Sequence, residues 1–255
     1  MKNHELPVLE TVVYDTNSVL TIEQWMRDGS VVVKPNEGAH GYGITTHINN
    51  KEQLDRAVLG AKSAFTDDGK IIVQKMYQNP VDIRILCINY KFVSAVHRIA
   101  ARVTGSGIHT VEQLIIQENS SKRGKSYEST LAQIDVEKAR QFLAEKMNNV
   151  PAVNEVVTVI GTANMGTGGE SSEISHTIPN WLIDIAQKCA RAVNLPVCGV
   201  DFMLKEIPTK ASYITDLNPI ITEVNKCPSF GLHDQPIYGT PSNATITFLD
   251  YINIL

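Results

Sequence analysis

The sequence predicts a single domain with an α+β fold built on antiparallel sheets, and three observations support this prediction. Short apolar runs and amphipathic segments are interleaved along the chain without strict strand–helix–strand alternation. Paired apolar runs flank short turn-forming segments, which is typical of antiparallel hairpins. No change in composition marks a linker within the 255 residues. We therefore expect a single domain over residues 1–255 that folds as two lobes, approximately 31–100 and 101–255.

The first half of the chain predicts several short strands and one helix. The β-branched run 31–33 predicts a buried strand that stops at Lys34–Pro35, and 44–48 predicts the strand that returns beside it. Residues 51–65 carry apolar side chains at helical spacing, which predicts a helix that ends before Gly69. Three more apolar runs predict strands at 71–73, 83–88 and 92–96, the last two as an antiparallel pair turning at Asn89–Tyr90.

The second half predicts more helix. Thr110 and Gln113 have the spacing of a capping box, which predicts a helix that carries Leu114 and Ile115. Apolar residues at helical spacing predict helices at 136–147, 181–193 and approximately 245–254. Apolar runs predict strands at 156–160, 197–204 and 220–224.

Composition and charge exclude several kinds of protein. The chain is 43% hydrophobic and 20% charged, which is typical of a globular protein. Its net charge of −4 provides no basic field for nucleic acid. No run approaches the roughly 20 apolar residues of a membrane span, and the polar residues 1–10 do not resemble a secretory signal. We expect a cytoplasmic protein with neither a nucleic-acid nor a membrane partner.

The cysteines are scattered along the chain, at Cys87, Cys189, Cys198 and Cys227. No two of them have the C-x-x-C spacing typical of zinc or redox sites. We therefore expect buried, free thiols in a reducing compartment.

A glycine-dense segment lies between the first two expected strands and contains Gly38, Gly41 and Gly43. Glycines accept positive φ and let backbone N–H groups surround phosphate oxygens. Lys34, at the end of the preceding strand, adds a positive charge for the same phosphates. The spacing differs from both the P-loop and the dinucleotide fingerprint, and a strand follows where those motifs have a helix. A β-turn would have the same composition, so both interpretations of this loop stay open.

Acidic and amide side chains gather near the ends of the last two strands. Glu223 and Asn225 stand two apart and should share a face of their strand, where Asp201 of the other strand can meet them. Hard oxygen ligands of this kind suit Mg²⁺. A solvated surface is the alternative interpretation. Asp216 and Asn218 repeat the spacing, but Asn218-Pro219 is typical of a turn, so we prefer Glu223 and Asn225.

A series of further segments occurs in a fixed order between residues 31 and 239. They are 33–36 with the glycine-dense loop, 73–77, 82–84, 97–111, 119–124, 163–169 and 223–239. Together they resemble the ATP-grasp superfamily, in particular the ATP-grasp domains of cyanophycin synthetases and of bifunctional glutamate–cysteine ligase/glutathione synthetases.

This resemblance implies a fold and an activity. The fold would be ATP-grasp, with two α+β lobes clasping a nucleotide, the first covering it and the second holding metal and substrate. The cofactors would be ATP and Mg²⁺, with Mn²⁺ as an alternative, and the substrates amino acids or peptides. The activity would be that of a carboxylate–amine ligase, which forms an amide through an acyl phosphate and releases ADP and phosphate.

The resemblance also implies roles for individual residues. Phosphate contacts are expected from Lys34 and from the loop at Gly38, Gly41 and Gly43. His40 and Tyr42 are expected to help close this loop over the site, with surface residues at the loop tip as the alternative. Adenine contacts are expected from the linker Gln74, Lys75, Met76 and Tyr77, and a ribose contact from Asp82. Catalytic roles are expected for Arg84, Arg98 and Asn164, and metal binding for Asp201, Glu223 and Asn225. Alternatives are a structural ion pair for the two arginines and a plain turn at Asn164. His233 is expected to brace the fold.

The chain departs from these relatives at four places. Ile160 replaces an arginine, Ser106 replaces an aspartate, and 173–176 replaces an Asp-x-Thr-Asp run. The N-terminal domain that precedes the ATP-grasp core is expected to be absent, so a homodimer mate or a partner subunit would complete the cleft. These departures leave a second hypothesis open, a non-catalytic ATP-binding subunit or a degenerate ligase that needs a partner.

Overall fold

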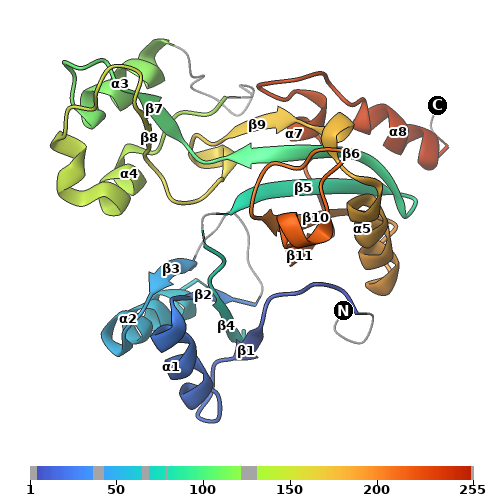
Figure 1. The fold of residues 1–255 in the computed structure, drawn as a ribbon, viewed down its shortest axis with the longest axis horizontal. Coiled ribbons are helices and arrows are strands. Elements are labelled where there is room, and N and C mark those ends of the chain that lie inside the picture. The colour runs from blue at the N-terminus through green and yellow to red at the C-terminus, as the bar shows by residue number, and fades with distance from the viewer. Residues whose placement is uncertain (1–4, 37–42, 65–68, 79, 122–130, 254–255) are drawn as a thin grey trace. The chain divides into compact units, whose positions relative to one another are not determined.

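A computed structural model describes residues 5–36, 43–64, 69–78, 80–121 and 131–253 of the chain (Figure 1). The chain divides into two compact units, a smaller one over Val8–Asn79 and a larger one that combines Met1–Pro7 with Pro80–Leu255. The division falls at Pro80, whereas we expected a lobe boundary near residue 100. The reason is that the strand directly after Pro80, Val81–Ile88, pairs with Val197–Leu204 and belongs to its sheet.

The described strands and helices follow the predicted order with several additions. The strands are β1 (Thr11–Val13), β2 (Val31–Pro35), β3 (Thr45–Ile48), β4 (Ile71–Lys75), β5 (Val81–Ile88), β6 (Lys91–Ile99), β7 (Arg102–Thr104), β8 (Val156–Thr158), β9 (Glu170–Glu173), β10 (Val197–Leu204) and β11 (Ile220–Asn225). The α-helices are α1 (Val19–Asp28), α2 (Lys51–Lys62), α3 (Val111–Ser121), α4 (Val136–Leu143), α5 (Asn180–Ala192), α6 (Ile214–Leu217), α7 (Gly231–Asp234) and α8 (Ala244–Tyr251). Short 3-10 helices are η2 (Ala144–Asn148), η3 (Met165–Thr167) and η4 (Ser175–Thr177).

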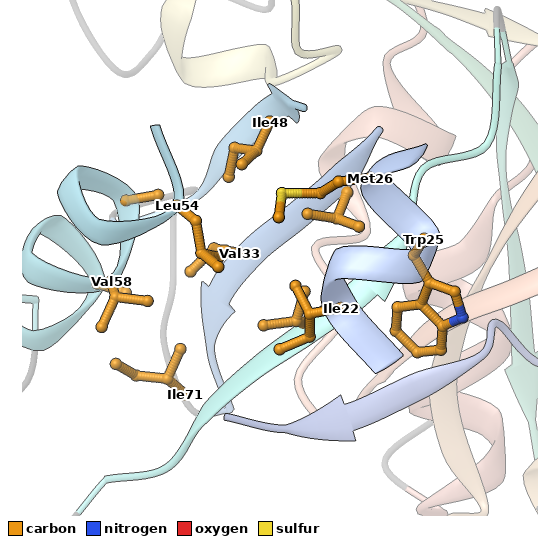
Figure 2. Packing of buried hydrophobic residues seen from close by; sticks show 12 residues of the cluster. Ile22, Trp25, Met26, Val33, Ile48, Leu54, Val58 and Ile71 are labelled. Atoms are coloured by element: carbon orange, nitrogen blue, oxygen red, sulfur yellow. The ribbon is translucent and has the colours of Figure 1, made fainter. Parts of the chain in front are cut away.

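The smaller unit is a four-stranded antiparallel sheet, in the order β1-β4-β2-β3, packed on two helices. Every second residue of β2 is buried, because alternate side chains of a strand point to opposite faces. Figure 2 shows the resulting core, in which Ile22 of α1 and Leu54 of α2 lie against Val33 and Ile71 of the sheet. One face of this sheet is therefore the hydrophobic core of the unit.

The larger unit contains a five-stranded antiparallel sheet in the order β11-β10-β5-β6-β9. Helix α5 packs against β5, β6 and β10 and buries Leu182 and Ala186. On β5, Leu86 and Ile88 form a separate apolar cluster with Ala244 of α8. Because side chains alternate, Asp82 and Arg84 share the face of Leu86 and Ile88. A charged stretch and an apolar stretch therefore follow each other along one face of the sheet.

Another apolar cluster of the larger unit surrounds the two-stranded ribbon β7-β8, with α3 and α4 packed on it. Helix α3 begins with the predicted capping box. The Thr110 N–H donates to Gln113 Oε1 at 2.9 Å, and the Gln113 N–H donates back to Thr110 Oγ1 at 3.3 Å. This prediction is confirmed.

Local turn chemistry predicted the β5–β6 hairpin correctly. Asn89 and Tyr90 both have positive φ, at 53° and 60°, which is the backbone of a type I′ turn. The predicted helix 136–147 was too long, because Ala144 has φ 50° and the chain continues as η2. The predicted helix 51–65 ends at Lys62.

Two observations test what we expected from the composition. Cys87, Cys189 and Cys198 are buried free thiols as expected, whereas Cys227 is exposed. Among the described helices, none has the length and apolar character needed to span a bilayer. Helix α1, the strands β1, β7 and β9, and the short helices α6 and α7 were not predicted.

Candidate functional site

A group of polar and charged side chains crosses four neighbouring strands on one face of the five-stranded sheet. We call it the charged cluster, and it comprises Asp82, Arg84, Arg98, Asp201, Glu223 and Asn225. The strand register brings these residues together: Asp82 lies opposite Arg98, Arg84 opposite Asp201, and Asp201 opposite Glu223.

The centre of the charged cluster is the ion pair between Arg84 and Asp201. The Arg84 Nε donates to Asp201 Oδ1 and its Nη2 donates to Oδ2, both at 2.7 Å. The side chains are 11% and 1% exposed, respectively. A bidentate arginine–carboxylate pair of this kind is strong and geometrically specific.

Arg98 links this pair to a second carboxylate. Its Nη2 lies 2.6 Å from Asp82 Oδ1 and 3.0 Å from Asp201 Oδ2. One guanidinium group thus neutralises part of the charge of two carboxylates, the partly buried Asp82 and the buried Asp201.

The predicted convergence of Glu223 and Asn225 on Asp201 is observed. The Asn225 Nδ2 donates to Glu223 Oε1 at 3.0 Å and to Asp201 Oδ2 at 3.3 Å. The Glu223 side chain is 49% exposed, so it forms the solvent-facing end of the charged cluster. The alternative pair with the same spacing, Asp216 and Asn218, caps helix α6. The Tyr213 N–H donates to Asp216 Oδ2, and Asn218 is the C-terminal cap.

Burial and charge set the protonation of the two aspartates in opposite directions. Burial raises the pKa of Asp82 to about 6, against the opposing effect of Arg98 and with a further contribution from the negative charge of Asp201. Burial would also raise the pKa of Asp201, but Arg98 and Arg84 more than offset it and lower that pKa below its usual value. Asp201 therefore stays ionised. Three carboxylates facing two arginines leave the charged cluster with an excess of negative charge.

The oxygen ligands at the solvent-facing end of the charged cluster suit a hard cation. Glu223 and Asn225 offer carboxylate and amide oxygens, and Mg²⁺ typically takes one or two carboxylates together with water and phosphate oxygens. In the described part of the chain, no group of three or more His, Cys, Asp or Glu side chains is arranged to hold a metal by itself. A cation here would therefore need ligands from a substrate as well.

Gly199 makes room for the Arg84 side chain, and the sequence analysis did not single it out. A Cβ atom at this position would lie 3.1 Å from Arg84 Cδ and 3.2 Å from Pro228 Cβ. A glycine inside a strand often marks such a close approach, which was the available signal.

His233 of α7 is buried next to the charged cluster. Its Nδ1 lies 2.6 Å from Ser94 Oγ on β6, and its Nε2 has no hydrogen-bond partner among the residues that the structure describes. Burial, aided by the positive charge of Arg84, lowers the pKa of His233 to about 3, so the imidazole is neutral. Ser94 is a partner that the sequence analysis did not identify.

The predicted Asn–glycine loop is a tight turn that leads into β9. The Gly166 N–H donates to Asn164 Oδ1 at 2.8 Å, and the Gly169 N–H donates to the Asn164 carbonyl at 2.9 Å. Gly168 has φ +100°, with its Cβ direction blocked by the Ile134 backbone. The loop connects to Ser171, which lies opposite Arg98 in the sheet. A catalytic role of Asn164 stays a prediction.

The positions that depart from the relatives have structural contacts. The Ser106 Oγ accepts from the His109 N–H at 3.0 Å and closes the turn after β7. Ile160 is 4% exposed and belongs to the core around α3 and α4. Glu173 accepts from the N–H and hydroxyl of Ser175.

The predicted nucleotide contacts of the smaller unit are only partly described. Lys34 lies on β2, and Gly43 has the positive φ expected of its loop, at 72°. The other predicted loop residues, Gly38, His40, Gly41 and Tyr42, lie outside the described residues, as do Arg123 and Gly124.

The predicted adenine linker makes contacts within the smaller unit. The buried Gln74 side chain donates to Thr11 Oγ1 at 2.9 Å, and the Met76 N–H donates to the Ser30 carbonyl at 2.9 Å. Lys75 Nζ lies 2.9 Å from Glu10 Oε2. Tyr77 follows two residues after the end of β4.

The sequence and the fold were compared with known proteins. No protein-family model matches the chain. It is 31% identical over 247 residues to a cyanophycin synthetase from Geminocystis herdmanii, which covers 95% of this chain and 28% of the relative. The chain thus spans less than a third of the length of the curated relatives that it matches.

Solved structures have a similar fold. The crystal structure of a bifunctional glutathione synthetase from Pasteurella multocida gives a TM-score of 0.63 at 21% identity, covering 100% of this chain and 35% of that one. The structure of the ATP-grasp ligase PsnB, in a complex with a precursor variant, Mg and ADP, gives a TM-score of 0.50 at 13% identity. This match covers 98% of this chain and 55% of that one. The chain therefore has the ATP-grasp fold, and its sequence is similar to those of cyanophycin synthetases.

Proposed function

We propose that this chain acts as an ATP- and Mg²⁺-dependent carboxylate–amine ligase that releases ADP and phosphate. The observation that carries the proposal is the charged cluster. It places Arg84 and Arg98, two permanent cations, directly beside the carboxylates of Asp201 and Glu223. Phosphoryl transfer depends mainly on positioning and charge neutralisation, and these groups provide both.

Each member of the charged cluster receives a role in this proposal. Glu223 and Asn225 would hold Mg²⁺ together with Asp201, and the ion would neutralise phosphate charge. Arg84 and Arg98 would bind the oxygens on which negative charge develops, because preorganised cations are effective there. Arg98 binds Oδ1 of Asp82, so we assign Oδ2 of Asp82 to the ribose hydroxyls.

The smaller unit is proposed to bind other parts of the nucleotide. Lys34 and the N–H groups of the glycine-dense loop would bind phosphate oxygens. The backbone of Gln74–Tyr77 would bind adenine. The Met76 N–H already donates to Ser30, so other groups of this stretch are assigned to the base.

The chemistry proceeds in two proposed steps. A carboxylate oxygen of the acid substrate attacks the γ-phosphorus, the bond from that phosphorus to the bridging oxygen breaks, and ADP leaves. The product is an acyl phosphate, whose carbonyl carbon is then attacked by the amine nitrogen. The tetrahedral intermediate expels phosphate, the nitrogen loses a proton, and the amide remains. We propose an amino acid or a small peptide for both substrates.

The test is ADP formation by the full chain with MgATP and a pool of amino acids and small peptides. Glu223→Ala is compared with Glu206→Ala, a control at an exposed position after β10. The proposal expects turnover that requires the pool, disappears in Glu223→Ala and persists in Glu206→Ala. ATP binding without turnover would support the non-catalytic alternative, and the absence of both would exclude nucleotide chemistry.

A further inference from the structure

Asp201 already has several hydrogen-bond donors. Arg84 donates to both oxygens and Asn225 donates to Oδ2 at 3.3 Å, while Arg98 Nη2 forms an ion pair with the same Oδ2 at 3.0 Å. A carboxylate has about four lone-pair positions in total. Two hydrogen bonds and the Arg98 ion pair meet at Oδ2, and one hydrogen bond reaches Oδ1, so Asp201 cannot keep all these contacts and also ligate a cation through both oxygens.

Loss of the Arg84 hydrogen bonds would free the most lone pairs on Asp201, because Arg84 donates to both carboxylate oxygens. It is also held in place by the shape of its neighbours. The missing side chain at Gly199 leaves the space in which Arg84 Cδ and Nε run along β10. The Arg84–Asp201 pair is therefore a built feature of the sheet, and not the chance meeting of two flexible surface groups.

We propose that Arg84 and a divalent cation compete for Asp201, so that binding of the cation releases the Arg84 guanidinium. This inference rests on the proposed function, in which Asp201, Glu223 and Asn225 bind Mg²⁺ near the nucleotide phosphates. It adds a coupling: cation binding frees a positive group next to the place where phosphate charge needs one. Glu223 is the entry ligand, because its side chain is 49% exposed while Asp201 is 1% exposed.

A permanent structural pair makes different predictions. In that case the cation binds only Glu223 and Asn225, and Arg84 keeps both oxygens of Asp201. The two arrangements differ in whether weakening the pair without changing the charge strengthens cation binding. Arg84→Lys is suitable, since lysine keeps the charge and loses the bidentate fork.

The experiment measures Mn²⁺ binding to the full chain by titration calorimetry, with and without ATP, for the wild type and for Arg84→Lys. Competition predicts about tenfold tighter binding in Arg84→Lys, the scale of one charge-assisted hydrogen bond. Gly199→Ala crowds Arg84 without altering any charge, so it should also tighten Mn²⁺ binding. This variant replaces Arg84→Lys in the experiment if Arg84→Lys does not fold. Arg102→Lys is the matched control, because Arg102 pairs with Glu170 and not with the charged cluster.

A second readout follows Arg84 directly. Its Nε–H group, bonded to Asp201 at 2.7 Å, should give a protected ¹⁵N–¹H signal that is absent from Arg84→Lys. Saturating Mg²⁺ should shift this signal or expose it to exchange. An unmoved signal, together with equal Mn²⁺ affinities in wild type and Arg84→Lys, would overturn the competition and leave the proposed function intact. No Mn²⁺ binding by the wild type, with or without ATP, would instead overturn the metal site on which both proposals depend.

Discussion

The buried imidazole of His233 is held by Ser94, whose Oγ lies 2.6 Å from its Nδ1. This contact joins α7 to the middle of β6. The charged groups that face the imidazole are Arg84, Arg98, Asp201 and Asp234, from the sheet and from α7 itself. The arrangement favours a neutral ring, and this has a consequence for stability.

His233 should make the protein sensitive to acid. Its pKa is about 3 in the folded protein and about 6.5 in an unfolded chain. Between these values the unfolded chain binds more protons, so stability rises with pH there and is lost as pH falls from about 6.5 toward 3. At pH 5 the cost is about 2 kcal/mol relative to pH 7.5. Urea unfolding of wild type and His233→Gln at both values should show a smaller pH effect in the variant. The exposed His176→Gln should behave like the wild type, and equal pH dependence in all three proteins would contradict the assignment.

Asp201→Asn should destabilise the fold by about 3–5 kcal/mol, because it leaves the buried Arg84 and the partly buried Arg98 without their shared carboxylate. Urea unfolding measures this directly. The double variant Asp201→Asn/Arg84→Met should be less destabilised than the sum of the two single changes. The exposed Asp184→Asn on α5 is the control and should change stability by about 0.5 kcal/mol or less. Additive losses would show that the pair contributes no coupling.

Glu223→Gln should separate activity from stability. Its side chain is 49% exposed, so the loss of its charge should change the free energy of unfolding by under about 1 kcal/mol. Turnover should fall by about 100-fold or more, the scale for removing one preorganised electrostatic group. Steady-state ADP release and urea unfolding on the same preparation test both statements. A variant with wild-type turnover would remove Glu223 from the proposed site.

Two glycine substitutions should have opposite effects. Gly168→Ala should cost more than about 1 kcal/mol, because φ is +100° and the new Cβ would lie 2.7 Å from Ile134 Cα. Gly60→Ala, inside α2 with nothing near the new Cβ, should stabilise by up to about 1 kcal/mol through higher helix propensity. Thermal unfolding of both variants is the measurement. If both variants changed the free energy of unfolding in the same direction, the inference of a backbone at Gly168 that only glycine tolerates would be wrong.

Much of the fold follows from interactions within a few residues. The turn at Asn89–Tyr90 and the cap at Thr110 were predictable because turn and capping residues act on their own backbone. Strand β10 was predicted with its observed bounds. In contrast, β9 has the sequence Glu-Ser-Ser-Glu, and its strand conformation depends on pairing with β6. Helix α4 ends early at Leu143, and no local signal predicts the positive φ of Ala144 that follows.

The sequence by itself determined which residues of the candidate site share a strand face. Glu223 and Asn225 meet because side chains on a strand repeat every second residue, and Asp82 and Arg84 do so for the same reason. Only the tertiary structure decided that Arg84 binds Asp201, at a separation of 117 residues. That contact depends on the register of β5 against β10, which is set when their apolar faces are buried beneath α5. Local patterns carry no information about the register between strands so far apart in the chain, because it results from packing.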